Sequence, residues 1–160
     1  MKVGIIGAGR IGKVHAKNIS MFVPEMEIKT IADPFMNEQT EAFAKSCGIP
    51  NTTKDANDIL NDPEIDAVLI CSSTDTHSKY IIEAAHAGKH IFCEKPIDYD
   101  LTKVRAAINA AKEAGTFIVA VDINSGMNGD SGDGFCVRSD RTVSIGCLKY
   151  GHLLGMAQGK

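Results

Sequence analysis

Short apolar runs alternate with longer segments of helical periodicity between residues 2 and 121. The runs are nearly continuous in Val, Ile and Ala, a composition typical of parallel strands that are covered on both faces. The segments between them carry an apolar stripe, as helices that pack on a sheet do. The predicted strands are Val3–Ile6, Ile28–Ala32, Ala67–Cys71, His90–Cys93 and Phe117–Val121.

The intervening segments also have the ends expected of helices. Residues 100–114 begin at a capping-type residue, Asp100, and stop before Gly115. Residues 76–87 stop in the same way before Gly88. This alternation of strand and helix predicts an α/β fold of the Rossmann type, with a doubly wound, mainly parallel sheet between helices in three layers.

The pattern changes beyond the last apolar run. Residues 122–133 are rich in Gly and Asn and have no helical period, and residues 150–160 form a Gly-rich tail. One further strand is predicted at Thr142–Cys147. We expect Phe117–Val121 to lie beside the earlier strands, so that residues 1–160 form a single domain with one continuous sheet.

Composition excludes several classes of function. The chain has 160 residues, which is about one domain, a net charge of −3 and no clustered run of Lys or Arg. We therefore expect neither a nucleic-acid partner nor a membrane partner. We expect no signal peptide and no membrane span, because the apolar start is soon interrupted by glycines and Arg10 and no apolar run has membrane length, and the five scattered cysteines are typical of a reducing, cytoplasmic setting. The sequence does not indicate an oligomeric state.

A glycine motif directly follows the first predicted strand. In the string GAGRIG, Gly7 permits a tight turn, Gly9 lets the backbone approach a pyrophosphate, and Gly12 lets the helix pack close to the strand. The amides of Arg10 and Ile11 would open the helix beside that phosphate. The motif predicts a dinucleotide partner, and the alternative is a purely structural glycine-rich turn.

An acidic residue ends the second predicted strand. Asp33 can accept hydrogen bonds from both hydroxyls of the adenosine ribose and repels a 2′-phosphate, so it favours NAD over NADP as the cofactor. The alternative is an Asp that starts a turn before Pro34. Arg10 could pair with a phosphate, which leaves some use of NADP open.

Two further strings make a family resemblance specific. CSSTDTH occupies residues 71–77 and GKHIFCEKP occupies residues 88–96. Together with GAGRIG and with IADP at residues 31–34, in this order, they resemble the glucose–fructose oxidoreductase/inositol 2-dehydrogenase family over residues 1–115.

This resemblance implies roles for five residues. Ser72, Thr74 and His77 would contact the cofactor, and Glu94 and Lys95 would lie beside the nicotinamide. Lys95 would also take part in substrate binding and proton transfer, as a catalytic residue. Without the family, Lys95 is an exposed Lys before a Pro, and His77 is a polar residue in the first turn of a helix. The family continues into a second α/β domain that builds the substrate pocket, and this sequence shows no counterpart of it.

Residues 116–160 resemble a different family. VAVDINSGMNGDSG at residues 119–132 and VRSDRTVSIG at residues 137–146 are similar to part of the NAD(P)HX epimerases. This second resemblance implies that Asp122 contacts the hydrated nicotinamide and that Ser125 helps to hold a potassium ion. The alternative is a structural loop at the edge of the sheet, because the upstream motif of that family is missing.

Two part-families in one chain indicate a hybrid, with the join near residues 115–120. Three functions remain as alternatives. The chain is an NAD-binding module without a complete catalytic site, an oxidoreductase acting on sugars or polyols, or a residual NAD(P)HX epimerase. The sequence favours the first, because the substrate domain and the upstream epimerase motif are both missing.

Overall fold

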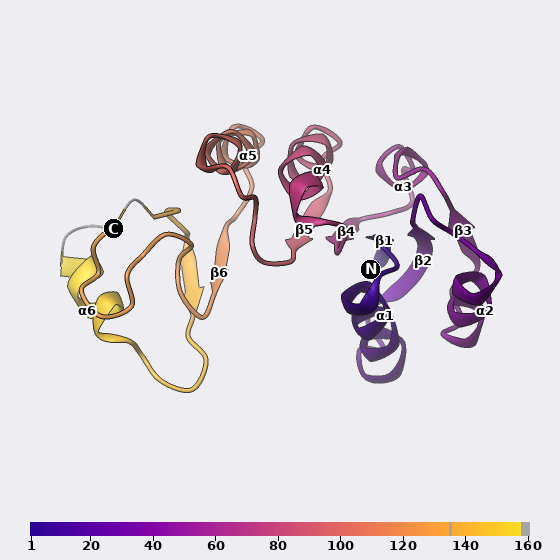
Figure 1. The fold of residues 1–160 in the computed structure, drawn as a ribbon, viewed down its shortest axis with the longest axis horizontal. Coiled ribbons are helices and arrows are strands. Elements are labelled where there is room, and N and C mark those ends of the chain that lie inside the picture. The colour runs from indigo at the N-terminus through magenta and orange to yellow at the C-terminus, as the bar shows by residue number, and fades with distance from the viewer. Residues whose placement is uncertain (135, 158–160) are drawn as a thin grey trace. The chain divides into compact units, whose positions relative to one another are not determined.

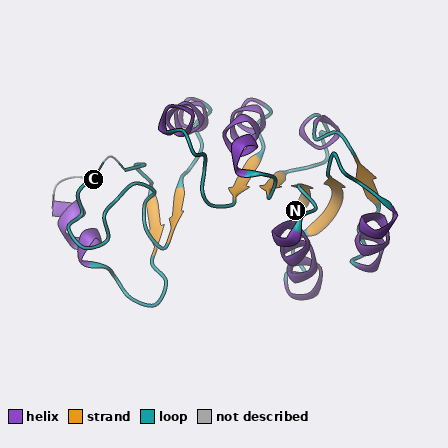
Figure 2. Ribbon diagram, in the orientation of Figure 1, coloured by secondary structure: helices purple, strands orange, loops and turns teal. Residues whose placement is uncertain are grey.

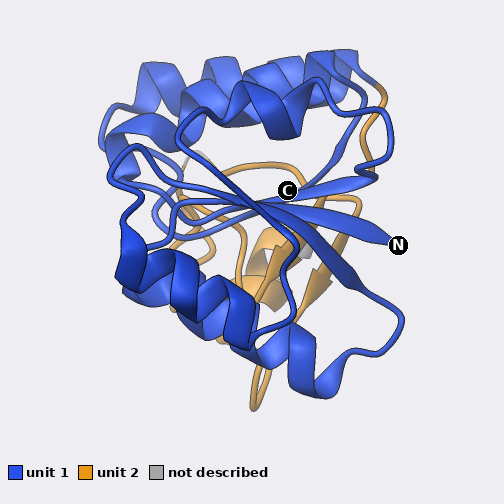
Figure 3. Cartoon of the chain, turned by 90° about the vertical axis from the view of Figure 1, so that its right-hand side faces the viewer, with its two compact units in different colours: residues 1–114 blue, residues 115–160 orange. Residues whose placement is uncertain are grey.

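The computed structural model of the chain describes residues 1–134 and 136–157. The chain divides into two compact units, Met1–Ala114 and Gly115–Lys160 (Figure 3). Across the described residues, no helix has both the length and the apolar character needed to cross a bilayer.

A parallel five-stranded sheet forms the centre of the first unit, with the strand order β3-β2-β1-β4-β5 (Figure 1). The order reverses between β1 and β4, as in doubly wound folds, so the carboxyl ends of the strands open a crevice there. The strands are β1 (Lys2–Ile6), β2 (Glu27–Ala32), β3 (Asn51–Thr53), β4 (Ala67–Ile70) and β5 (His90–Cys93).

Helices cover both faces of this sheet. In Figure 1, α1 and α2 lie on one side, and α3, α4 and α5 lie on the other. On the first side, Val3 and Ile5 of β1 pack with Ala16 of α1. On the second, Val68 of β4 packs with Ile81 of α4. The predicted Rossmann fold is confirmed. The helices are α1 (Arg10–Phe22), α2 (Glu38–Ser46), α3 (Asn57–Leu60), α4 (Thr74–His86) and α5 (Leu101–Glu113).

Two of the helices, α2 and α5, start at a residue whose side chain caps them. Asp100 precedes α5, and its side chain accepts a hydrogen bond from the Thr102 amide at 2.8 Å, as the sequence predicted. Asn37 caps α2 in the same manner and accepts from the Thr40 amide at 3.0 Å. These bonds satisfy amides that have no partner inside the helix.

Two elements of the first unit were not predicted. The strand β3 consists of Asn51, Thr52 and Thr53, which carry no apolar signal, and it lies at the edge of the sheet beside β2. The short helix α3 follows it and buries Ile59 and Leu60. An edge strand needs no apolar run, because it is not enclosed by neighbours on both sides.

The second unit has a small sheet of its own. The strand β6 (Val119–Val121) pairs in parallel with β7 (Arg141–Val143), and Val119 faces Arg141 in the register. The prediction of one continuous sheet is therefore wrong. Hydrogen bonds from Asp140 and Arg141 to the Ile118 carbonyl, 2.8 and 3.2 Å long, tie the start of β6 to β7 instead.

The Gly-rich tail also differs from the expectation, because residues 150–157 form the helix α6 (Tyr150–Ala157; Figure 2). A Cβ on Gly151 would collide with the carbonyl oxygen of Asn128. A Cβ on Gly155 would lie 2.9 Å from the terminal methyl of Met127. The glycines thus permit close packing of a helix on the preceding loop, which a pattern of apolar side chains does not reveal.

Candidate functional site

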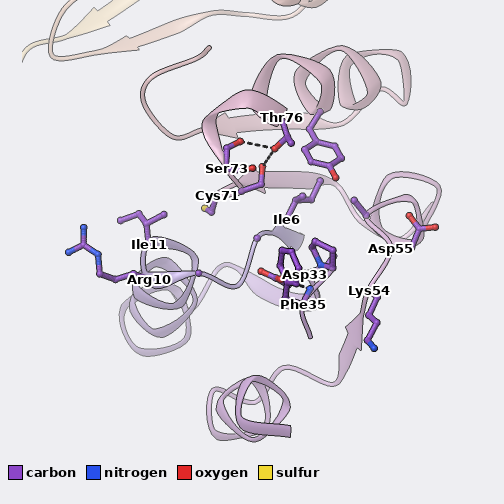
Figure 4. A pocket seen from close by; sticks show the side chains of 17 residues that line it. Ile6, Arg10, Ile11, Asp33, Phe35, Lys54, Asp55, Cys71, Ser73 and Thr76 are labelled. Atoms are coloured by element: carbon purple, nitrogen blue, oxygen red, sulfur yellow. Dashed lines mark hydrogen bonds between the residues drawn. The ribbon is translucent and has the colours of Figure 1, made fainter. Parts of the chain in front are cut away.

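A cleft of about 750 Å³ opens at the carboxyl ends of the strands in the first unit (Figure 4). Its volume lies within the range usual for small-molecule sites. Arg10 and Ile11 lie on one side of it, Lys54 and Asp55 lie on the other, and Asp33 lies between them. The lining residues are Ile6, Gly7, Gly9, Arg10, Ile11, Ala32, Asp33, Pro34, Phe35, Lys54, Asp55, Ala56, Cys71, Ser72, Ser73, Thr76 and Tyr80.

The three glycines of the turn after β1 have different surroundings. Gly7 has a φ of 105°, and a Cβ there would lie 2.6 Å from the Cys71 carbonyl. A Cβ on Gly12 would collide with the carbonyl oxygen of Gly7. A Cβ on Gly9, by contrast, would meet nothing within 4 Å. Gly7 and Gly12 are therefore required by the fold, whereas Gly9 leaves open space at the cleft.

The amino end of α1 is free to receive an anion. Gly9 precedes the helix, and within this fully described element no side chain caps the first amides and no acidic residue stands in the first turn. Unpaired amides and the helix dipole give this end a partial positive charge. Open space at Gly9 and an uncapped helix end fit the pyrophosphate of a dinucleotide.

Asp33 is half-buried and lies in the wall of the cleft. One carboxylate oxygen accepts from the Ala8 amide at 2.7 Å, and the other accepts from the Phe35 amide at 2.8 Å. Each oxygen keeps a further acceptor position, because a carboxylate offers about four in all. The side chain is thereby held rigidly and can still accept from two ribose hydroxyls. Phe35 beside it is 84% exposed.

The loop after β4 contributes part of what the sequence suggested. Ser72 lines the cleft, and its hydroxyl lies 2.7 Å from the hydroxyl of Thr76. Thr74 begins α4 and is not among the lining residues. His77 is only 2% exposed, and its two ring nitrogens lie 2.8 Å from the Pro96 carbonyl oxygen and 3.0 Å from that of Ser72. The structure therefore brings His77 to two loops rather than to the open cleft.

Glu94 and Lys95 follow β5, outside the lining residues of the cleft. Glu94 accepts from the His15 Nε2 at 2.6 Å and from the Lys95 amide at 3.2 Å. Partial burial raises the pKa of Glu94, but the hydrogen bond from His15 and that of the Lys95 amide outweigh it and lower the pKa below its usual value. The side chain of Lys95 is exposed.

Asp122 and Ser125 belong to the second unit. Asp122 has a φ of 72°, accepts from the Ile145 amide at 3.0 Å and forms an ion pair with Lys149. The hydrogen bond from Lys149 and that of the Ile145 amide lower the pKa of Asp122. Ser125 is exposed. Among the described residues there is no group of three or more His, Cys, Asp or Glu side chains that could hold a metal ion.

Several lining residues were missed from the sequence. Lys54 and Asp55 follow the polar strand β3, which itself gave no signal. Thr76 and Tyr80 lie one turn apart on α4, and this spacing could have indicated a shared helix face. Phe35 directly follows the predicted Asp33-Pro34 turn, and no sequence pattern assigned it to the cleft that it lines.

Known proteins resemble this chain over the same region. Residues 1–122 match the model of the Gfo/Idh/MocA family, described as an oxidoreductase family with an NAD-binding Rossmann fold. The uncharacterized oxidoreductase YrbE of Bacillus subtilis is 48% identical over 112 residues, which are 70% of this chain and 32% of the relative. Myo-inositol 2-dehydrogenase of Thermotoga maritima is 40% identical over 114 residues, which are 71% and 34% of the two chains.

A solved structure agrees with these relatives. Scyllo-inositol dehydrogenase from Lactobacillus casei, with bound NAD(H) and scyllo-inositol, has a TM-score of 0.67 and 30% identity over 72% of this chain and 34% of that chain. The chain thus spans about a third of the length of the proteins it matches. Since the family model covers more than half of its residues, the chain belongs to the glucose–fructose oxidoreductase/inositol 2-dehydrogenase family, and its first unit is the NAD-binding Rossmann fold of that family.

Proposed function

We propose that this chain is the NAD-binding module of an oxidoreductase of the inositol dehydrogenase type, and that it prefers NAD to NADP. The position of Asp33 carries the proposal: its carboxylate is held by two backbone amides in the wall of the cleft. A fixed carboxylate there accepts from ribose hydroxyls and opposes a 2′-phosphate. Arg10, which lines the cleft as Lys54 does, would support the remaining affinity for NADP.

Different residues bind different parts of the cofactor. In the proposal, Gly9, Arg10, Ile11 and Gly12 receive the pyrophosphate at the start of α1, and Asp33 receives the adenosine ribose. Ser72, Thr74 and His77 belong to the segment that follows β4, and Ser72 is the one that contacts the cofactor. Glu94 and Lys95 lie toward the nicotinamide, which supplies hydride transfer when the cofactor is bound. The cationic amine of Lys95 would there stabilise or protonate an oxygen of the substrate.

Binding of four dinucleotides tests this proposal. Calorimetric titration of the 160-residue chain with NAD, NADH, NADP and NADPH is expected to give tighter binding for the two forms that lack the 2′-phosphate. Equal affinities for NADH and NADPH would contradict the role of Asp33. Failure of all four to bind would contradict the proposed module.

We also propose that residues 116–160 are an epimerase-type segment joined to the dehydrogenase-type part, which makes the chain a hybrid. The boundary between the compact units, at Ala114 and Gly115, supports this, as does the end of the family match at residue 122. Because Lys149 and the Ile145 amide engage Asp122, we expect no epimerisation of hydrated NADH. Chromatography of the two epimers measures this. Epimerisation by the unmodified chain that is abolished in Asp122→Asn would contradict that expectation.

A further inference from the structure

The segment that carries Lys95 is held at both ends by histidines from different helices. His15 lies on α1, and its Nε2 lies 2.6 Å from Oε1 of Glu94. His77 lies on α4, and its Nδ1 lies 2.8 Å from the carbonyl oxygen of Pro96. Lys95 is the residue between these two contacts. The two helices also begin at the cleft, because the turn before α1 and the loop before α4 line it.

The contact of His15 has a fixed geometry. Its side chain is 25% exposed, and that of Glu94 is 17% exposed, so both are largely removed from water. The imidazole ring lies edge-on to Phe92 of β5, with 5.2 Å between the ring centres. This packing orients the ring, and the ring orients one oxygen of Glu94. The other oxygen of Glu94 accepts from the backbone amide of Lys95 at 3.2 Å.

The far end of the segment is fixed independently of His15. The buried ring of His77 packs between the Pro96 and Ser72 carbonyl oxygens, 2.8 and 3.0 Å from its two nitrogens, so this segment lies against a loop that lines the cleft. The Glu94 amide also donates to the Ile70 carbonyl at 3.0 Å, and the hydrogen bond from the Lys95 amide to the Glu94 carboxylate then fixes the backbone at Lys95 itself. A hydrogen bond to an ionised carboxylate is roughly twice as strong as one between neutral groups, which makes this contact suited to positioning.

We propose that His15 is a positioning residue for Lys95 and acts through the carboxylate of Glu94. The chain of contacts runs from α1, whose amino end faces the cleft, through His15 and Glu94 to the Lys95 amide. The inference rests on the proposed function, because the purpose of the contact would be to place Lys95 beside the nicotinamide. The contact itself exists without the cofactor and can be tested without it.

Nuclear magnetic resonance of the chain labelled with 15N-lysine gives a direct measurement. Only lysine amides are then observed, and the Lys95 signal is the one that Lys95→Arg removes. His15→Leu removes the donor to Glu94, whereas His15→Gln keeps an N–H donor near the position of Nε2. His86→Leu is the matched control, because His86 is an exposed histidine at the end of α4.

The unliganded variants decide the proposal. The Lys95 amide is expected to keep its chemical shift and its hydrogen-exchange rate in His15→Gln and in His86→Leu. In His15→Leu it is expected to shift and to exchange faster, while the amide of Lys29 in β2 stays unchanged. An unchanged Lys95 amide in His15→Leu would overturn the proposal. If His15→Leu does not fold, His15→Phe, which keeps an aromatic ring beside Phe92 and has no N–H donor for Glu94, replaces it, and an unchanged Lys95 amide in that variant would overturn the proposal.

Addition of NADH then tests the proposed function separately. In the unmodified chain NADH is expected to shift the Lys95 amide, and this shift is expected to shrink in His15→Leu. If NADH binds but leaves the Lys95 amide of the unmodified chain in place, the position of Lys95 beside the nicotinamide is wrong. The positioning role of His15 is then still decided by the unliganded spectra.

Discussion

Asp33 illustrates how one side chain serves both the fold and the site. Its two oxygens fix the amides of Ala8 and Phe35, and the same oxygens face the cleft. We expect Asp33→Ala to weaken NAD binding by about 1–3 kcal/mol, the scale for losing a hydrogen bond to a charged group. The preference for NAD over NADP is expected to narrow at the same time, as measured by calorimetry. Asp75→Ala, at an exposed aspartate outside the cleft lining, is the control and should change neither quantity.

Gly9 and Gly12 are expected to respond oppositely to the same substitution. A Cβ on Gly9 meets nothing within 4 Å, so Gly9→Ala should leave the melting temperature unchanged while it obstructs the pyrophosphate and weakens NADH binding. A Cβ on Gly12 collides with the carbonyl of Gly7, so Gly12→Ala should lower stability by about 1–3 kcal/mol. Thermal unfolding and NADH titration of both variants measure this. A loss of stability in Gly9→Ala equal to that in Gly12→Ala would refute the distinction.

Two thiols near the cleft are expected to be inert. Burial, with the nearby carboxylate of Glu94, raises the pKa of Cys71 and of Cys93 to about 12. Only the thiolate is a nucleophile, so at pH 8 about one in 10,000 of these groups can react. Iodoacetamide should therefore label the exposed Cys147 first, as followed by peptide mass spectrometry. Labelling of Cys71 in the folded chain at the rate of Cys147 would show that the cleft wall opens.

At the scale of elements, the sequence predicted what apolar burial and capping determine. The strands β1, β2 and β4 each lie between two other strands, and their apolar runs indicated this burial; the edge strand β5 also has an apolar run, although Phe92 in it is 42% exposed. Asp100 was a correct start for α5 because its side chain caps the helix. The strand β3 was missed because an edge strand of Asn and Thr has no apolar signal. The pairing of β6 was wrong because an apolar run predicts a strand and does not specify its neighbour.

The candidate site was predicted to a similar extent. Gly7, Gly9 and Asp33 stand in a spacing that has a physical reason, and all three line the cleft. Lys54 was not found, because its place depends on the missed strand β3. The contact between His15 and Glu94 joins residues 79 positions apart, which no local pattern indicates. Spacing thus reveals sites built within one turn, and sites assembled from distant loops require the fold.

The second unit is expected to be dispensable for cofactor binding. Because β6 pairs with β7, removal of residues 115–160 takes no strand from the five-stranded sheet. We expect the fragment 1–114 to unfold cooperatively and to bind NADH within about threefold of the full chain, a difference of less than about 1 kcal/mol. Circular dichroism and calorimetry of the fragment measure this. Loss of binding by a folded fragment would show that the second unit contributes to the site.

At the scale of the whole molecule, binding and turnover are expected to separate. Hydride transfer needs a cofactor, a substrate held against the nicotinamide, and an acid or base at the reacting oxygen. In our proposal the first requirement is met by the cleft, and the third is met in part by Lys95. The relatives are about twice as long as the 160-residue chain, and the matched region covers only about a third of each of them. Among the described residues, Lys95 is exposed rather than enclosed in a pocket that excludes water.

We therefore expect the 160-residue chain to show no reduction of NAD with myo-inositol or simple sugars, even at saturating cofactor. Loss of substrate positioning alone removes about 7–11 kcal/mol of barrier lowering, which places turnover below detection. The measurement is the absorbance of NADH at about 340 nm, which is characteristic of the reduced nicotinamide. Turnover that disappears in Lys95→Ala would overturn the expectation and establish an active oxidoreductase. Turnover of the same rate in Lys95→Ala would identify a contaminating enzyme, since Lys95 is the group proposed to act at the reacting oxygen.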